Sequence, residues 1–276
     1  MAAQGTRADQ GAARFKADLR TLHPGPTSAA GELLHASGGD ATLEALARAA
    51  RLRTLAQLLD YPTLDAAERA LGALRDLTVA GAGMPERLRR GFERIEAELA
   101  TADLDRLAAE YVRLFGPIGR CALHGTAYGV AGRFCGRPAQ LADIAGFYRA
   151  FGLEPSDRDA VPEDDLRLQL EFLSVLSIKE AWARDRQLDD ALTVTIETQR
   201  KFVAEHFAAW LDEWNAELAR ANADSLYRVA GELVRDAARA ECQRLGVVPS
   251  VTSRQPVDIE IGGDGFGCLS KAEERP

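Results

Sequence analysis

The stretch from Pro162 to Trp182 constrains the fold more than any other part of this chain. Its first half alternates apolar and polar residues, as a half-buried strand does. A helix is favoured all the same, because the run continues for about twenty residues without glycine or a further proline, and because Pro162 and three acidic residues stand where a helix begins. As a helix it has two apolar faces, formed by Leu166, Leu170, Leu173, Ser177 and Ile178 and by Leu168, Phe172, Val175 and Leu176. An apolar surface this wide predicts the central helix of an all-α domain.

Helical periodicity continues on both sides of this stretch. Helices are expected at 42–61, 64–80, 85–99, 104–115, 139–151, 189–221 and 224–245, with Pro62 ending the first and Asp103 capping the fourth. Residues 1–40 mix small, polar and helix-breaking residues, and residues 247–276 contain the run G-G-D-G-F-G-C. We therefore expect a flexible N-terminal segment at 1–40, one compact helical bundle at 41–246 and a disordered tail at 247–276.

A long loop is predicted at 116–138, which holds six glycines and two prolines. Loops of this length inside a helical protein are uncommon and usually functional. Tyr111, Leu114 and Phe115 come immediately before it, on the apolar face of the preceding helix. Two interpretations of these three side chains stay open: they are ordinary core residues, or they form the floor of an apolar groove.

Composition and charge narrow the class of partner. The formal net charge is -8 and the sequence pI is about 5.2, which disfavours nucleic acid and favours basic or apolar partners. No apolar run approaches the roughly 20 residues that span a bilayer, and the first residues lack the apolar core of a signal peptide. We therefore expect a cytoplasmic protein. Its four cysteines, Cys121, Cys135, Cys242 and Cys268, match no zinc template and are expected to stay reduced.

Catalytic motifs are absent from the sequence. It contains no GxSxG elbow, no phosphate-binding GxxxxGK[ST] loop, no HExxH and no ExxH. The four histidines are scattered, and His206, at the edge of an apolar helix face, is expected to be structural. These observations predict neither an enzyme nor a resident metal or cofactor.

The acidic run Glu163-Asp164-Asp165 has two interpretations that the residues alone do not separate. As first-turn acids, these side chains would oppose the helix dipole and contribute about 0.3–1 kcal/mol each. Alternatively, some of them face the glycine-rich loop and receive a cationic partner, for which arginine is the natural match through bidentate pairing.

Several sequence blocks resemble a known family. They are Glu110-Tyr111-Val112-Arg113-Leu114-Phe115-Gly116-Pro117, His124-Gly125-Thr126-Ala127-Tyr128, Phe147 to Leu153, Asp164 to Leu173, and the single residues Phe202, His206, Trp210 and Tyr227. In this order, over residues 42 to 246, the chain resembles the TorD/DmsD/NarJ family of maturation chaperones for molybdenum enzymes. It departs from the family pattern at four positions: Asp165 stands where the family has His, Gln169 and Gly125 stand where it has Glu, and Thr126 replaces Ser.

The resemblance implies a single helical bundle of the TorD/DmsD type that binds a client protein without catalysis. The implied client is the immature catalytic subunit of a molybdopterin oxidoreductase, bound through its mature region, its twin-arginine leader or both, and the departures suggest the type II branch. Client binding is assigned by the resemblance to Tyr111, Leu114, Phe115, His124, Thr126, Tyr128, Asp164 and Asp165. Two other functions stay open: a generic helical adaptor that binds an amphipathic helix, and a small helical enzyme.

Overall fold

The computed structural model describes residues 39–79, 84–128, 137–153 and 161–250. Within these ranges the regular structure is helical apart from one isolated β-bridge, which confirms the predicted all-α class. The predictions for residues 1–38 and 251–276, and those for Cys135 and Cys268, lie outside the described residues. None of the helices in the described ranges is both long and apolar enough to cross a membrane.

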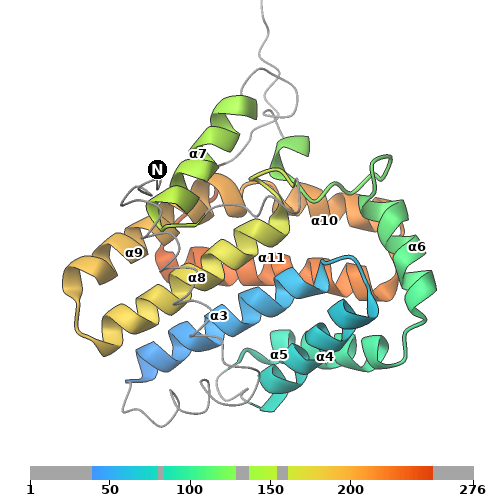
Figure 1. Cartoon of the computed structure of the whole chain (residues 1–276), viewed down its shortest axis with the longest axis horizontal. Coiled ribbons are helices and arrows are strands. Elements are labelled where there is room, and N and C mark those ends of the chain that lie inside the picture. The colour runs from blue at the N-terminus through green and yellow to red at the C-terminus, as the bar shows by residue number, and fades with distance from the viewer. Residues whose placement is uncertain (1–38, 80–83, 129–136, 154–160, 251–276) are drawn as a thin grey trace, which may run out of the picture.

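Figure 1 shows the described helices as one packed bundle. In chain order they are α3 (Asp40–Leu58), α4 (Leu64–Val79), α5 (Glu86–Ala100), α6 (Leu104–Phe115), the 3-10 turn η1 (Gly125–Ala127), α7 (Arg137–Ala150), α8 (Leu166–Asp185), α9 (Asp189–Phe202), the π-helical turn η2 (Val203–Phe207), α10 (Leu211–Arg220) and α11 (Ser225–Leu245). The predicted Asp103 cap is present, since its side chain accepts hydrogen bonds from the backbone N–H groups of Asp105 and Arg106.

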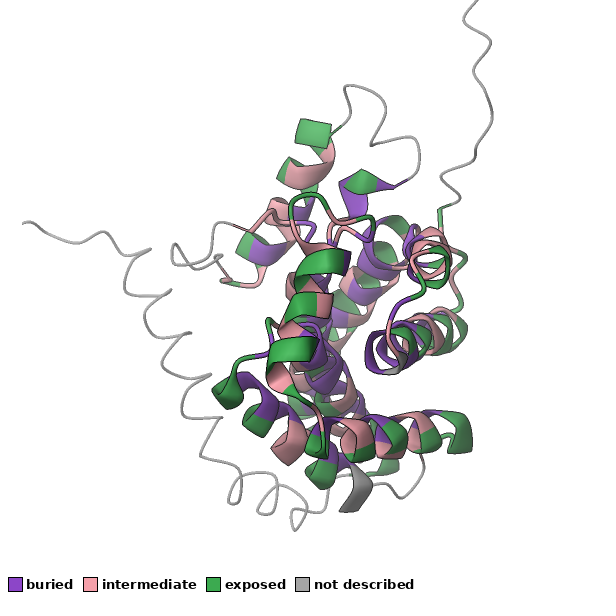
Figure 2. Ribbon diagram, turned by 90° about the vertical axis from the view of Figure 1, so that its right-hand side faces the viewer, coloured by how far each residue is buried: buried purple, intermediate pink, exposed green. Residues whose placement is uncertain are grey.

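Helix α8 is extensively buried, as its wide apolar surface predicted. It packs along the length of α3 and against α9, in the middle of the view in Figure 1. Small residues let α3 and α8 approach closely: Ala49 of α3 is buried, and its carbonyl oxygen accepts a hydrogen bond of 2.9 Å from Ser174 Oγ of α8. Leu170, Phe172 and Leu173 of α8 are also buried in the common core. Figure 2 shows the buried residues where helices face one another and the exposed ones outside.

The start of α8 differs from the prediction. The helix begins at Leu166, not at Pro162, so Asp164 and Asp165 precede its first turn and Asp165 is the N-cap. The cause is the extended backbone of Asp165, which bridges to His124; beside it Gly125 N–H donates to Asp164 O (3.2 Å) and Leu166 N–H donates to Leu123 O (2.6 Å). A residue held in an extended bridge cannot also adopt helical dihedrals. The predicted position of these acids in the first turn was therefore wrong, although Asp165 still stands at the helix N-terminus as its cap.

The predicted continuous helix over 189–221 was also wrong, because a π turn at Val203–Phe207 and a short turn after it separate α9 from α10. Buried residues recur here every four positions, at Thr195, Gln199, Val203, Phe207 and Leu211. Positions four apart drift by about 40° around an α-helix of 3.6 residues per turn. The wider π turn cancels that drift and keeps the whole row in the core.

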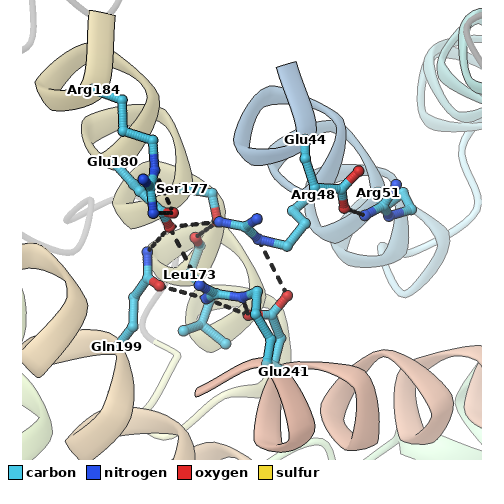
Figure 3. A network of polar contacts seen from close by, with 10 residues as sticks. Glu44, Arg48, Arg51, Leu173, Ser177, Glu180, Arg184, Gln199 and Glu241 are labelled. Atoms are coloured by element: carbon cyan, nitrogen blue, oxygen red, sulfur yellow. Dashed lines mark hydrogen bonds and ion pairs between the residues drawn. The ribbon is translucent and has the colours of Figure 1, made fainter. Parts of the chain in front are cut away.

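A buried ionic network joins four of the helices (Figure 3). Glu180 of α8 bonds Arg48 of α3 and Gln199 of α9, and it lies 3.5 Å from Arg244 of α11, which also pairs with Glu241. Burial alone would raise the pKa of Glu180, but Arg48 and Arg244 outweigh it and hold the pKa below its usual value. The network therefore keeps an ionised carboxylate inside the bundle.

Candidate functional site

The residues before the predicted loop form an aromatic cluster, which we define as Tyr61, Tyr111, Phe115 and Tyr227. Tyr111 is the centre: its ring makes edge contacts with Tyr61 (5.4 Å between centroids), Phe115 (5.0 Å) and Tyr227 (6.1 Å). Tyr227 is buried, Tyr111 and Phe115 are half-buried, and Tyr61 is 47% exposed. The cluster thus runs from the core to the surface, and its role as the floor of an apolar groove stays a prediction.

Leu114 lies under this cluster and is fully buried. A small pocket of about 20 Å³ borders the cluster and is lined in part by Asp60, Pro62 and Tyr227. That volume is enough for roughly one water molecule. The cluster is therefore a surface with apolar, edge-packed rings rather than a deep hole.

A chain of charges lies against the aromatic cluster. Asp165 receives two parallel hydrogen bonds of 2.9 Å from the Arg167 guanidinium, and Arg167 also lies 3.6 Å from Asp60 Oδ1. Burial alone would lower the pKa of Arg167, but pairing with Asp165 raises it overall. Burial raises the pKa of Tyr111, whose hydroxyl also interacts electrostatically with Arg167, Asp165 and Asp60. Asp165 is thus already occupied by an arginine of its own chain.

Asp164 is fully buried and holds the loop in place. Its Oδ2 accepts a hydrogen bond of 2.6 Å from Thr126 N–H, and its backbone oxygen accepts one of 3.1 Å from the Gln169 side chain. In the described part of the chain, its Oδ1 and Thr126 Oγ1 make no hydrogen bond. Contact between Asp164 and a client would require the loop to move.

Packing explains why glycine occupies position 125. A Cβ atom there would lie 2.9 Å from Trp210 Nε1, closer than real Cβ contacts come. Trp210 in turn stacks on Tyr128 (5.3 Å between centroids, 16° between planes), and the Tyr128 hydroxyl donates to Ala122 O. The glutamate that the family pattern has at this position would not fit beside Trp210.

The structure brings the predicted residues together in two adjoining groups, one on α6 and one where the loop meets α8. Of the eight, His124, Tyr111 and Phe115 are half-buried, whereas Leu114, Thr126, Tyr128, Asp164 and Asp165 are buried. Three further contributors were not assigned to the site from the sequence: Tyr61, Tyr227 and Arg167. Tyr227 had been noted only as a family match, and Arg167 could have been suspected from its position two residues after the cap.

Similarity to known proteins extends over α6, the loop and α8. A family model described as "Nitrate reductase delta subunit" matches residues 82–216, which include α6, the loop and α8. The selenate reductase assembly chaperone protein of Thauera selenatis is 31% identical over 143 residues, which cover 51% of this chain and 72% of that protein. The chain belongs to the TorD/DmsD/NarJ chaperone family.

Other members of the TorD/DmsD/NarJ family match more partially. Chaperone protein TorD of Vibrio cholerae is 28% identical over 150 residues, covering 54% of this chain and 63% of TorD. The perchlorate reductase assembly chaperone protein of Dechloromonas aromatica is 34% identical over 82 residues, covering 30% of this chain and 36% of that protein. These relatives are named as chaperones and not as catalysts, in agreement with the prediction that this family member is not an enzyme.

A solved structure, a putative redox enzyme maturation protein from Archaeoglobus fulgidus, covers 72% of this chain and 93% of its own at 19% identity. Its TM-score is 0.38, a likeness too weak to carry an argument.

Proposed function

We propose that this protein is an assembly chaperone that binds the immature catalytic subunit of a molybdopterin oxidoreductase of the dimethyl sulfoxide reductase family. The observation that carries the proposal is the aromatic cluster at the C-terminal end of α6, two of whose members, Tyr111 and Phe115, lie within the residues that the family model matches. Half-buried aromatic side chains that reach the surface supply large contact area at a small cost in side-chain entropy, and they are common at binding hot spots.

The exposed and the buried residues of the site have different parts in this proposal. Tyr61, Tyr111, Phe115 and His124 have exposed surface and contact the client. The five buried residues position them: Leu114 and Tyr128 through packing, and Thr126, Asp164 and Asp165 through the bonds that fix the loop to α8. Asp60 directly precedes Tyr61 and keeps 41% of its side chain exposed, so it offers a carboxylate beside the aromatic rings. An arginine followed by an apolar stretch, as in a twin-arginine leader, suits such a surface.

In this function the chaperone holds the apo subunit open in the cytoplasm while the molybdopterin cofactor is inserted, and delays export where the client carries a twin-arginine leader. The protein needs no cofactor of its own for that task. The relatives named for selenate and perchlorate reductases favour a client of the type II branch, whose members reduce or oxidise small substrates.

The experiment is co-expression with candidate molybdoenzyme catalytic subunits from the same source, followed by purification through this chain. Recovery of the apo subunit, lost in Tyr61→Ala and kept in Trp182→Ala, supports the proposal. Trp182 is a matched control because it is a comparably exposed aromatic (54% against 47%) on another part of the surface. Recovery of an unrelated protein instead would favour the generic adaptor.

A further inference from the structure

The π turn between α9 and α10 gathers three metal-ligating side chains that the proposed function does not use. Asp143 of α7, Glu205 and His206 each offer one ligand atom, and these atoms all lie within 4.8 Å of one another. His206 Nε2 and Asp143 Oδ2 are 2.9 Å apart. The sequence predicts a structural role for His206 and no metal.

The imidazole of His206 is held in place by the aromatic rings packed around it. His206 is only 5% exposed, and its ring lies 5.5 Å, between centroids, from both Phe147 and Phe202. Two metal bonds of about 2.1 Å place their donor atoms about 3.0 Å apart at right angles and about 3.4 Å apart at the tetrahedral angle, and the 2.9 Å between Nε2 and Oδ2 is near the first of these values. One imidazole and two carboxylates suit a first-row divalent ion and would neutralise its charge.

A plain histidine–aspartate hydrogen bond accounts for the 2.9 Å distance as well, but not for the rest of the arrangement. It does not need Glu205, whose carboxylate stays within reach of both groups although it is exposed. The π turn that keeps the buried row in the core also contains both His206 and Glu205, and it holds their ligand atoms near Asp143 of α7.

We propose that Asp143, Glu205 and His206 form a binding site for a divalent first-row transition ion such as Zn²⁺ or Co²⁺. The ion binds His206 Nε2, so the imidazole proton moves to Nδ1, which makes no hydrogen bond in the described part of the chain. A ligand histidine without such a partner typically loses 10–100-fold in affinity, so the dissociation constant should be on the order of micromolar rather than nanomolar. Bound metal links α7 to the π turn and restrains α7 on the bundle.

The test is titration of the purified full chain with Co²⁺, followed by calorimetry and visible absorption. Two variants remove the charged ligands while sparing the fold: Asp143→Asn keeps an oxygen that accepts from His206 Nε2–H, and Glu205→Gln changes an exposed side chain. Glu197→Gln is the matched control, because it removes the same charge from an exposed position on α9 outside the cluster.

The proposal predicts saturable uptake of one Co²⁺ per chain, with affinity at least tenfold weaker in Asp143→Asn and in Glu205→Gln and unchanged in Glu197→Gln. Three results would overturn it. The first is the absence of saturable uptake, and the second is uptake of equal affinity in all three variants. The third is a thiolate-to-cobalt charge-transfer band, which would place the ion on a cysteine.

Discussion

Gly125 shows how a single residue shapes the candidate site. Because its missing Cβ leaves room for Trp210, Gly125→Ala should force that ring or the loop to shift and lower the free energy of unfolding by about 1–3 kcal/mol. Gly72→Ala is the matched change, since a Cβ at this position of α4 meets nothing within 4 Å and alanine favours the helix by about 0.5–1 kcal/mol. Urea unfolding of both variants measures the difference. Equal effects would contradict the close approach at Gly125.

Asp164 is now predicted to act through the loop. Asp164→Asn weakens the bond to Thr126 N–H and should cost about 1–3 kcal/mol of stability, the range for a buried polar group that loses its charged partner. Client binding should then fall only in proportion to the unfolded fraction. A double-mutant cycle with a client arginine is the check. A coupling energy well above zero would instead restore the direct contact suggested by the sequence.

The sequence could predict those parts of this site whose residues lie close together along the chain. Tyr111, Leu114 and Phe115 share a helix face, so spacing alone placed them together. The pairing of the 123–125 backbone with 164–166 needs two distant segments to meet in space, whereas Asp165 and Arg167 are only two residues apart. Periodicity carries no such information, and the acids were therefore placed one turn too far into the helix.

Helix α8 is where the sequence was most informative, because its buried residues recur over its whole length. Leu170→Ala removes a fully buried side chain and should cost about 2–5 kcal/mol. Trp182→Ala, on the same helix but 54% exposed, should cost less than about 1 kcal/mol. Thermal or denaturant unfolding compares the two. Similar losses for both would show that α8 is not the central element.

The π turn was missed for a physical reason. A row of buried residues at intervals of four fits an α-helix over a few turns, and the 40° drift becomes decisive only when the row continues for about four turns. Thr195 and Gln199 are polar, so the sequence did not mark them as members of a buried row, and the four-residue interval from Thr195 to Leu211 emerges only from their burial in the structure.

The ionic network predicts how helix packing responds to pH. The folded-state pKa of Glu180 is lowered, so its stabilising contribution is fully present above the unfolded-state pKa near 4.5 and is lost as the pH falls through the lower folded-state pKa. Near neutral pH, Glu180→Gln leaves Arg48 and Arg244 poorly compensated and should cost about 3–5 kcal/mol. Glu93→Gln, in an exposed pair with Arg89, should cost less than about 1 kcal/mol.

The stability difference between wild type and Glu180→Gln should therefore shrink when the pH is lowered from about 7 to about 3. Denaturant unfolding across this range measures it. A difference that stays constant, or grows as the pH falls, would contradict an ionised Glu180 in the folded protein.

Taken as a whole molecule, the chain combines a buried helical core with a surface where aromatic rings, carboxylates and the described part of the loop, residues 116–128, adjoin. The described helices bury their apolar faces in one shared core. The aromatic cluster is therefore an extension of the core to the surface, which suits a protein that binds exposed apolar chain rather than transforms a substrate.

The most direct measurement is the affinity of the purified chain for the apo catalytic subunit of a molybdoenzyme from the same source, by calorimetry, with wild type, Tyr61→Ala and Trp182→Ala compared. Loss of an interface aromatic typically costs about 2 kcal/mol or more, so Tyr61→Ala should weaken binding by about 30-fold with little change in the free energy of unfolding. Trp182→Ala should bind as wild type does. Equal affinity for all three proteins, or no binding by wild type to any such subunit, would contradict the proposed function.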